Sequence, residues 1–415
     1  MRSTIFVLFC LFSLPLVADD EKLKDKEFVS QQTLDLSSSN NEFAFNLYKN
    51  LEESPDNVCF SPYSISSALA MVYDGSKEET RKEMGDVLHF TILSSTLNES
   101  FSLLNRFFEK TSTDVPADFR IYISNSLWLQ TGTPILPQFL DNIAKYFKSF
   151  VRRVDFARQK DTARREINYF VKEKTMGKII DLIGPSDIQE STKMMLISSI
   201  YMRAKWQNLF DEARTKMQAF FVNKDKTISI STMNETGFYP FFKSETLTAV
   251  SLPYIHPKEN LPQLEFLILL PQENFGLSEL KKNINAEFFK NIISSFESEE
   301  INIYLPKFSF SKSFSLNSVL IKMGMIAAFN SDANFEGING LKDLQIGQVA
   351  HKAFISVDES GTESSAATAV IMNMKSILIK KEPIIFKVDH PFMFIIYEKL
   401  TGSILFCGHV MNPLE

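Results

Sequence analysis

Histidine is the side chain best suited to proton transfer or metal binding near neutral pH, and the chain has five. Four of them do not lie at a spacing from an Asp, a Cys or a second His that is typical of a metal site. We expect these four to be structural or solvent-facing: His89, His256, His390 and His409. His351 lies in an apolar, strand-like segment from Gln348 to Ala353, where a hydrogen-bonded core histidine is the favoured interpretation.

Nucleophile and phosphate-binding motifs are absent from the sequence. It has no G-x-S-x-G turn, no H-E-x-x-H helix, no C-x-x-C pair and no G-x-x-x-x-G-K loop. Because a hydrolase needs a nucleophile, a base and an oxyanion hole, an enzyme is the least favoured class. The sequence predicts no catalytic residue, no metal site and no cofactor.

Three small basic pairs are candidates for contacts with anions or glycosaminoglycans: Arg152-Arg153, Arg164-Arg165 and Lys380-Lys381. Acidic residues lie near each pair, and the net charge of the chain is -6. Nucleic-acid binding, which favours basic faces, is therefore not expected. We interpret the pairs as solvated surface and allow at most a weak contact with a polyanion.

The most unusual segment runs from Val357 to Val370 and is rich in small residues. Alternate positions from Thr362 onward are uncharged, while Glu363 falls on the opposite parity, which is a strand pattern. Gly361 and the small side chains offer little cross-strand packing, so this strand is weak on its own. The segment could be an exposed loop or an inserted strand.

Helices and strands must position this segment. Helical spacing of apolar residues predicts helices around 43–51, 66–73, 139–147 and 162–175. Strand patterns cover 121–129, 194–206, 247–254, 264–270, 301–310 and 386–397. Helices in the first half and long strands in the second predict an α+β fold with large mixed or antiparallel sheets.

The N-terminal residues 1–18 contain Arg2, an apolar run and Ala18 before an acidic stretch, which predicts a secretory signal peptide. This run is too short to span a bilayer, and no later apolar segment is long enough, so we expect an exported protein without a membrane span. Residues 19–39 are polar and mixed in charge, which predicts a flexible arm. Residues 40–415 then form one large domain.

Removal of the signal leaves only Cys59 and Cys407, too few for a disulfide scaffold. Pairing across neighbouring strands stays open, and buried free thiols are the favoured interpretation. Two sequons, at Asn98 and Asn234, are candidate glycosylation sites and would lie on the surface of an exported protein.

Motifs along nearly the whole mature chain resemble the serpin family, in family order. Val357 to Val370 resembles the mobile hinge of its reactive loop, and Asn57 to Met71 the start of its second helix. Phe406 to Pro413 resembles its C-terminal signature, and further matches lie at 167–179, 200–206, 305–308, 351–353 and 390–392. The resemblance implies a single domain with three β-sheets, about nine helices and an exposed reactive-centre loop.

The resemblance also assigns site residues. The polar cluster that controls opening of the main sheet falls on Ser61, Ser64, Ser198 and His351, and Trp206 falls near the point where the loop enters. Serpins usually have Asn at the position of Ser198, and alanines are common where this chain has Ser364-Ser365. The loop hinge comprises Glu359, Gly361, Thr362, Glu363, Ser364, Ser365, Ala366, Ala367 and Thr368.

By resemblance, the protein is a monomeric suicide inhibitor of serine proteases. The protease cleaves the loop, forms an acyl-enzyme and is carried across the inhibitor as the loop inserts into the main sheet. Counting the family's usual loop length from Glu359 places the reactive bond at Lys375-Ser376. A lysine before the bond predicts a trypsin-like target.

Other bonds and functions stay open. Lys380 or Lys381 could be the bait, while Met372 or Met374 would suit chymotrypsin-like or elastase-like proteases. A non-inhibitory serpin acting as a carrier or chaperone, or an inhibitor of cysteine proteases, is the alternative function.

Overall fold

The computed structural model describes residues 28–51, 56–109, 119–258, 261–362 and 382–415. Within these ranges the chain forms ten α-helices, labelled α2 to α11, and fifteen strands. The predicted signal peptide, the hinge residues 363–368 and the bond Lys375-Ser376 lie outside the described residues. Helices and mixed sheets in one domain confirm the predicted α+β class.

Helices concentrate in the first half of the chain, as the periodicity predicted. The expected helix over 139–147 is α6 followed by a short π-helix, η2. The helices are α2 (Gln31–Asn50), α3 (Pro62–Gly75), α4 (Glu78–Leu88), α5 (Ser94–Glu109), α6 (Pro137–Asn142), η2 (Ile143–Phe147), α7 (Lys160–Lys174), η3 (Glu212–Arg214), α8 (Leu277–Asn283), α9 (Ala286–Ser294), α10 (Asn317–Lys322), η4 (Ala327–Phe329) and α11 (Glu336–Asn339).

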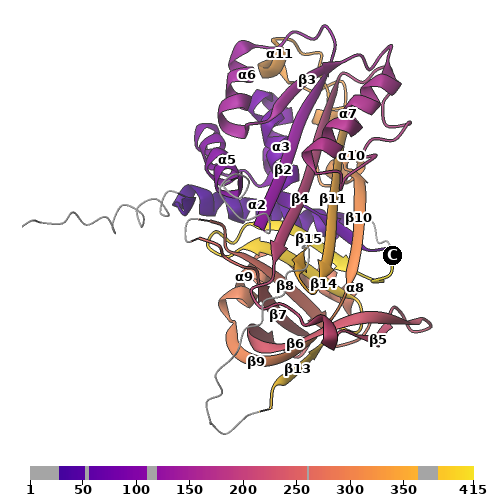
Figure 1. Ribbon diagram of the computed structural model, residues 1–415. Coiled ribbons are helices and arrows are strands. Elements are labelled where there is room, and N and C mark those ends of the chain that lie inside the picture. The colour runs from indigo at the N-terminus through magenta and orange to yellow at the C-terminus, as the bar shows by residue number, and fades with distance from the viewer. Residues whose placement is uncertain (1–27, 52–55, 110–118, 259–260, 363–381) are drawn as a thin grey trace, which may run out of the picture.

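The main sheet has six strands that run along the long axis of the molecule (Figure 1). Their order is β10 (Phe308–Ser315), β11 (Gln348–Asp358), β12 (Gly361–Thr362), β4 (Met194–Lys205), β2 (Phe119–Gln130) and β3 (Phe150–Val154). Successive side chains of a strand point to opposite faces. Accordingly Met195 and Ile197 pack in the cluster with α7, whereas Leu196 packs in the larger core with α3.

The other nine strands form two further sheets, which are joined through one short ladder. Strands β6 and β7 pair only over Phe241–Lys243 and Thr248–Val250, whereas β6 and β9 pair from Thr232 to Phe241. With the main sheet this gives the three predicted sheets. The strands are β1 (Val58–Phe60), β15 (Ile404–Val410), β14 (Phe392–Glu398), β8 (Leu264–Pro271) and β7 (Leu247–Pro253), then β6 (Thr227–Lys243), β9 (Glu297–Pro306), β13 (Ile384–Lys387) and β5 (Lys216–Phe221).

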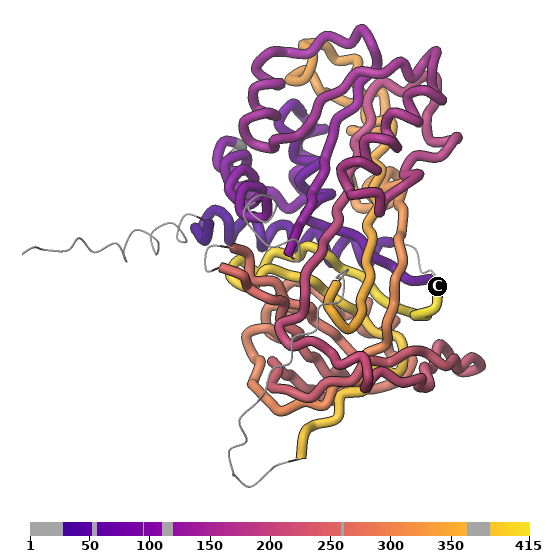
Figure 2. The backbone as a smooth tube through the Cα atoms, in the orientation of Figure 1, coloured from indigo at the N-terminus to yellow at the C-terminus, as the bar shows by residue number. Residues whose placement is uncertain are grey.

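The prediction of a flexible arm through residue 39 was wrong over 28–39, because α2 begins at Gln31. Leu36 is fully buried, and Thr33 and Ser37 donate hydrogen bonds to the carbonyls of Phe28 and Thr33. A composition argument counts such residues as polar, although short hydroxyls can satisfy themselves on the backbone of a buried helix. In Figure 2 this indigo helix lies beside the yellow C-terminal strands, which places it in the same domain.

The two cysteines are free and buried. Cys59 pairs with Gly408 across β1 and β15, and Cys407 pairs with Phe60. Cross-strand partners share a face and consecutive residues do not, so the two thiols point to opposite faces of the sheet and cannot form a disulfide.

Apolar segments that could be taken for membrane spans are strands: Leu264–Pro271 is β8 and Phe392–Glu398 is β14. In the part of the chain that the structure describes, no helix combines the length and apolarity needed to cross a bilayer.

Gly408 offers a test of the packing between β1 and β15. A Cβ at this position would lie 1.9 Å from the carbonyl oxygen of Val58. We expect Gly408→Ala to separate the two strands and lower the free energy of unfolding by about 3 kcal/mol, measured by urea denaturation. The control is Gly184→Ala, whose Cβ meets Asp187 only at 3.4 Å and should cost less than about 1 kcal/mol. Equal stability of the two variants would contradict this interpretation.

Candidate functional site

Four side chains that the sequence analysis grouped together do meet, at the centre of the main sheet. Ser61 caps α3, Ser64 lies in its first turn, and Ser198 and His351 are paired residues of β4 and β11. All four are completely buried. Ser64 Oγ lies 2.8 Å from Ser198 Oγ, which lies 3.1 Å from His351 Nδ1. This cluster joins α3 to the two central strands of the sheet.

The hydrogen bonds of the cluster have one consistent direction. The backbone N–H of Ser61 donates to His351 Nε2 at 3.0 Å, so Nδ1 carries the proton of the neutral ring and donates to Ser198. Ser198 then donates to Ser64, which in turn donates to Asn125 Oδ1 at 3.0 Å. Asn125 Nδ2 closes the circuit by donating to the carbonyl of Ser64 at 3.1 Å. The chain of bonds links β11, β4, α3 and β2.

Asn125 is a member of the cluster that sequence reasoning missed. It pairs with Ser198 across β2 and β4, and 5% of its surface is exposed. The strand pattern over 121–129 placed it in a buried sheet, and a buried Asn requires hydrogen-bond partners. That requirement was the available signal. The side chain at Ser198 is short, but the amide of Asn125 bonds directly to Ser64 and so connects β2 to the cluster.

Burial governs the protonation of His351. Desolvation disfavours the charged ring and lowers the pKa of His351 to about 3, although its hydrogen bond with Ser198 acts in the opposite direction. The imidazole is therefore neutral at physiological pH, which its acceptor role at Nε2 requires.

Strands β4 and β11 are bonded directly along only part of their length. Their parallel ladder runs from Gln348–Met195 to Ala353–Ile200. Farther along, β12 lies between them: Thr362 pairs with Val357 of β11 and with Ala204 of β4. Two residues of the predicted hinge, Gly361 and Thr362, thus already form a strand of the main sheet.

Gly361 is required at the point where the chain turns into the sheet. Its φ is +152°, a conformation that favours glycine, and a Cβ there would lie 2.1 Å from the carbonyl oxygen of Ala204. The following residue, Thr362, is buried, and its hydroxyl bonds with Tyr254 Oη. Thr362 therefore points into the protein, the side to which the alternation assigned it.

Trp206 lies beside this entry point, as predicted. Its indole N–H donates to the carbonyl of Asp358 at 2.9 Å, and its backbone N–H donates to that of Ser360 at 3.0 Å. The ring stacks on Tyr254 with centroids 4.6 Å apart. Trp206 therefore holds both the turn before β12 and the tyrosine that contacts Thr362.

Glu359 anchors the same turn through an ion pair. Lys307 Nζ lies 2.7 Å from Glu359 Oε2, and Thr215 donates to Oε1 at 2.8 Å. Burial alone would raise the pKa of Glu359, but these hydrogen bonds and the charge of Lys307 lower it overall. The carboxylate is charged at neutral pH, and it ties the turn to Lys307, between β9 and β10, and to Thr215, just before β5.

The two sequon asparagines do not lie free on the surface. Asn98 is 5% exposed and its Nδ2 donates to Asp74 Oδ1 at 2.7 Å, so the prediction of a surface position was wrong there. Asn234 is partly buried, and its Nδ2 donates to Asn302 and to the carbonyl of Ile303. A glycan on either nitrogen would have to displace these bonds.

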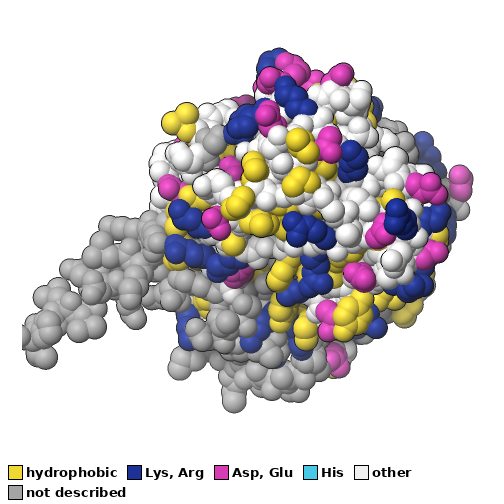
Figure 3. All heavy atoms as spheres, turned by 90° about the horizontal axis from the view of Figure 1, so that it is seen from above, with side chains coloured by type: hydrophobic (Ala, Val, Ile, Leu, Met, Phe, Trp, Pro, Cys, Tyr) yellow, Lys and Arg dark blue, Asp and Glu magenta, His cyan; other side chains and the backbone are white. Residues whose placement is uncertain are grey.

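Two of the basic pairs lie within the described residues, whereas Lys380-Lys381 lies outside them. Arg152, Arg153 and Arg165 are exposed, which agrees with a solvated surface, and Arg164 is partly buried and faces Asp161 at 3.7 Å. The face of the molecule in Figure 3 has acidic and basic side chains interspersed, with no continuous basic area.

Comparisons with known proteins agree with this geometry. The family model for Serpin (serine protease inhibitor) matches residues 38–413. An uncharacterized serpin-like protein of Thermococcus kodakarensis is 37% identical over 375 residues, which cover 90% of this chain and 85% of that protein. The leukocyte elastase inhibitor of Xenopus laevis is 34% identical over 387 residues, 91% of this chain and 99% of that one.

Solved structures give the same result. Human thyroxine-binding globulin in complex with thyroxine has a TM-score of 0.83 and 28% identity, covering 92% of this chain and 100% of that one. The native thermophilic serpin tengpin has a TM-score of 0.81 and 26% identity, covering 92% and 95%. The chain belongs to the serpin family.

Proposed function

We propose that this serpin inhibits serine proteases by inserting its cleaved loop into the main sheet. The observation that carries the proposal is β12, which lies between β11 and β4 and is bonded to both. An inserting strand has to begin at such a site, because it needs partners on two sides. Between β12 and the ladder that ends at Ala353–Ile200, residues 354–356 of β11 and 201–203 of β4 do not pair with each other. The inserted strand can therefore lengthen over these residues before any bond of that ladder breaks.

The register of β12 predicts where each later residue would lie. Continuing its antiparallel pairing along β11 brings Thr368 opposite His351, and its pairing along β4 brings Thr368 opposite Ser198. The hydroxyl of Thr368 would then replace the direct bond between these two residues, with no buried polar group left unpaired. The same register brings Ile371 opposite Gln348, the start of β11.

The energetics favour such an insertion. About ten inserted residues at ~3.3 Å each would carry an attached protease roughly 30 Å, and each new ladder bond adds about 1 kcal/mol net. Opening must first separate β4 from β11, which breaks the contact of Ser198 with His351. We infer that the cluster of Ser61, Ser64, Ser198 and His351 sets the resistance to opening.

We further propose Lys375-Ser376 as the reactive bond and a trypsin-like protease as the target. The register supports this position, because Lys375 falls a few residues beyond the end of the strand that β11 can accept. A relative is named for inhibition of leukocyte elastase, so cleavage after Met372 or Met374 is the competing specificity. Export through residues 1–18 stays a prediction from the sequence, as does glycosylation.

A carrier function is the second candidate. It is favoured by the similarity to thyroxine-binding globulin, whose structure contains thyroxine. A carrier would be cleaved by proteases without trapping them, so the first experiment below separates the two functions.

Incubation with trypsin-like, chymotrypsin-like and elastase-like proteases tests the function and its specificity. We expect a complex stable in SDS with trypsin-like enzymes and a new N-terminus at Ser376. Lys375→Ala should abolish trapping of these enzymes, while the control Lys387→Ala, in β13, should retain it. Cleavage without a complex by every protease would refute inhibition, and a new N-terminus elsewhere would refute the bond.

Thr368→Arg tests the register. Arginine would be buried between Ser198 and His351, so insertion should slow and more inhibitor should be cleaved than trapped, at least tenfold by gel densitometry. The control is Ala367→Arg on the opposite parity, which should trap protease almost as well as the unchanged protein. Equal trapping by both variants would contradict the predicted pairing.

The pKa of His351 predicts the pH dependence of stability. Its folded pKa of about 3 lies below the ordinary value of 6.5, so its contribution is complete above pH 6.5 and is lost as the pH falls toward 3. Between pH 6.5 and 5 this loss is about 2 kcal/mol by proton linkage. Urea unfolding of His351→Gln should show a smaller loss over that interval, and His256→Gln should behave as the unchanged protein. Parallel pH curves for the unchanged protein and His351→Gln would contradict this role.

A further inference from the structure

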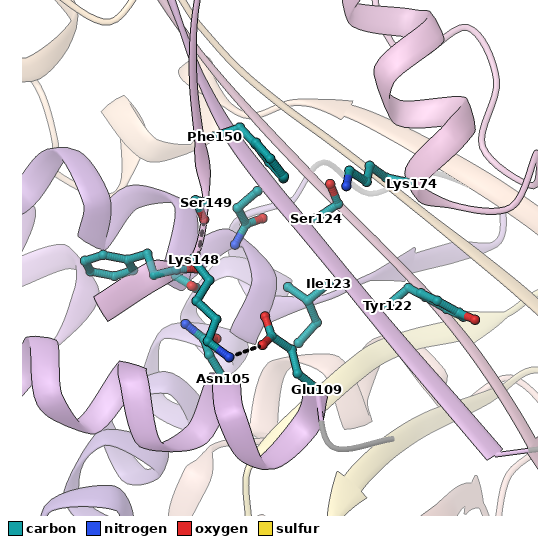
Figure 4. A pocket seen from close by; sticks show the side chains of 12 residues that line it. Asn105, Glu109, Tyr122, Ile123, Ser124, Lys148, Ser149, Phe150 and Lys174 are labelled. Carbon is teal, nitrogen blue, oxygen red and sulfur yellow. Dashed lines mark hydrogen bonds and ion pairs between the residues drawn. The ribbon is translucent and has the colours of Figure 1, made fainter. Parts of the chain in front are cut away.

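A cavity of about 370 Å³ lies at the edge of β2 in the main sheet. Its lining comes from α3, α5, β2, the turn after η2, and the end of α7 (Figure 4). Natural small-molecule sites have volumes of roughly 300–1,000 Å³, so the cavity can hold a small ligand.

Backbone geometry explains why the cavity is there. Strand β3 pairs with β2 only from Phe150–Ser126 onward, so residues 122–125 of β2 have no strand on their outer edge within the described chain. The π-helix η2 ends at Phe147 and is followed by Lys148, a non-glycine residue with φ of +47°, which forms the turn between η2 and β3. π-helical turns are rare and often occur at functional sites.

One polar group of the lining lacks a partner among the described residues. Ser124 is 8% exposed, and no described residue forms a hydrogen bond with its Oγ. Asn105, another lining residue, accepts a bond from Tyr63 at Oδ1. Buried polar groups are normally satisfied, so an unsatisfied hydroxyl group at a cavity indicates a ligand that supplies the bond.

The charges at the rim select an anion. Lys148 is neutralised by Glu109 at 2.8 Å. Lys174 forms no ion pair in the described part of the chain and lies over the ring of Phe150 at 4.5 Å. Figure 4 shows Lys174 and Ser124 on one side of the cavity and the Lys148–Glu109 pair on the other. Lys174 therefore remains available to pair with a ligand that carries one negative charge.

The remaining walls are apolar, with Ile123, Phe147 and Phe150 in the lining. We propose that the cavity binds a medium-chain monocarboxylate, with its carboxylate at Lys174 and Ser124 and its hydrocarbon chain against these three side chains.

The site is coupled to the sheet through Asn125, which lines the cavity and also bonds to Ser64 in the polar cluster. Insertion of the loop moves β4 away from β11, and β2 is bonded to β4 along its whole length. A ligand that binds between β2 and α5 when the sheet is closed therefore opposes opening of the sheet. The size of this effect equals the difference between the free energies of ligand binding to the closed and to the opened sheet. This coupling rests on the proposed inhibitory function, whereas the binding site does not.

Calorimetric titration with octanoate tests the site. We expect binding in the micromolar range by the unchanged protein, at least fivefold weaker binding by Lys174→Gln, and unchanged binding by the control Lys172→Gln, which lies outside the lining. Octanamide, which lacks the charge, should bind at least fivefold more weakly than octanoate. Phe150→Ala should weaken the binding of both compounds. Equal octanoate affinity in Lys174→Gln and the unchanged protein, or no binding up to millimolar octanoate, would overturn the site.

Protease trapping with and without octanoate tests the coupling. Saturating octanoate should at least double the number of inhibitor molecules consumed per trapped protease, and this effect should be absent in Lys174→Gln. Octanoate binding without any change in trapping would overturn the coupling alone. If no protease is trapped at all, the proposed function fails while the titrations still decide the site.

Discussion

The structure depends on an incomplete ladder between two parallel strands. Strands β4 and β11 pair with each other directly only from Gln348–Met195 to Ala353–Ile200. Beyond that ladder, β12 lies between the two strands and pairs with both of them. Exposed strand edges attract further strands, because unpaired N–H and C=O groups seek partners. In this fold the edge is internal, and the chain supplies its own strand.

Two polar systems lie along this edge. Beside β12, Trp206, Lys307 and Glu359 hold the preceding turn. Farther along, the cluster around His351 joins β4, β11 and α3. In the proposed insertion, the hydroxyl groups of this cluster would exchange partners with Thr368, whereas a purely apolar contact in the same place would offer no hydrogen-bonding group to the incoming strand.

Much of this arrangement could be predicted from sequence, because the residues occur in specific motifs. The resemblance to serpins groups Ser61, Ser64, Ser198 and His351, and these four side chains do lie together in the structure. Composition was a poorer guide. It placed residues 28–39 in a flexible arm, since it cannot distinguish a hydroxyl group exposed to water from one bonded to a helix backbone. The sequon was also misleading at Asn98, because it suggested a surface position although the amide is buried and bonds to Asp74.

The role of Asn125, which connects β2 to α3, could not be predicted from the sequence for a different reason. A single buried Asn in a strand indicates a hydrogen bond but does not name its partner. Only the pairing of β2 with β4 brings its amide to Ser64. The same residue forms part of the cavity wall, because β3 leaves that edge of β2 uncovered. The polar cluster and the cavity therefore share one side chain, and any displacement of β2 must change both.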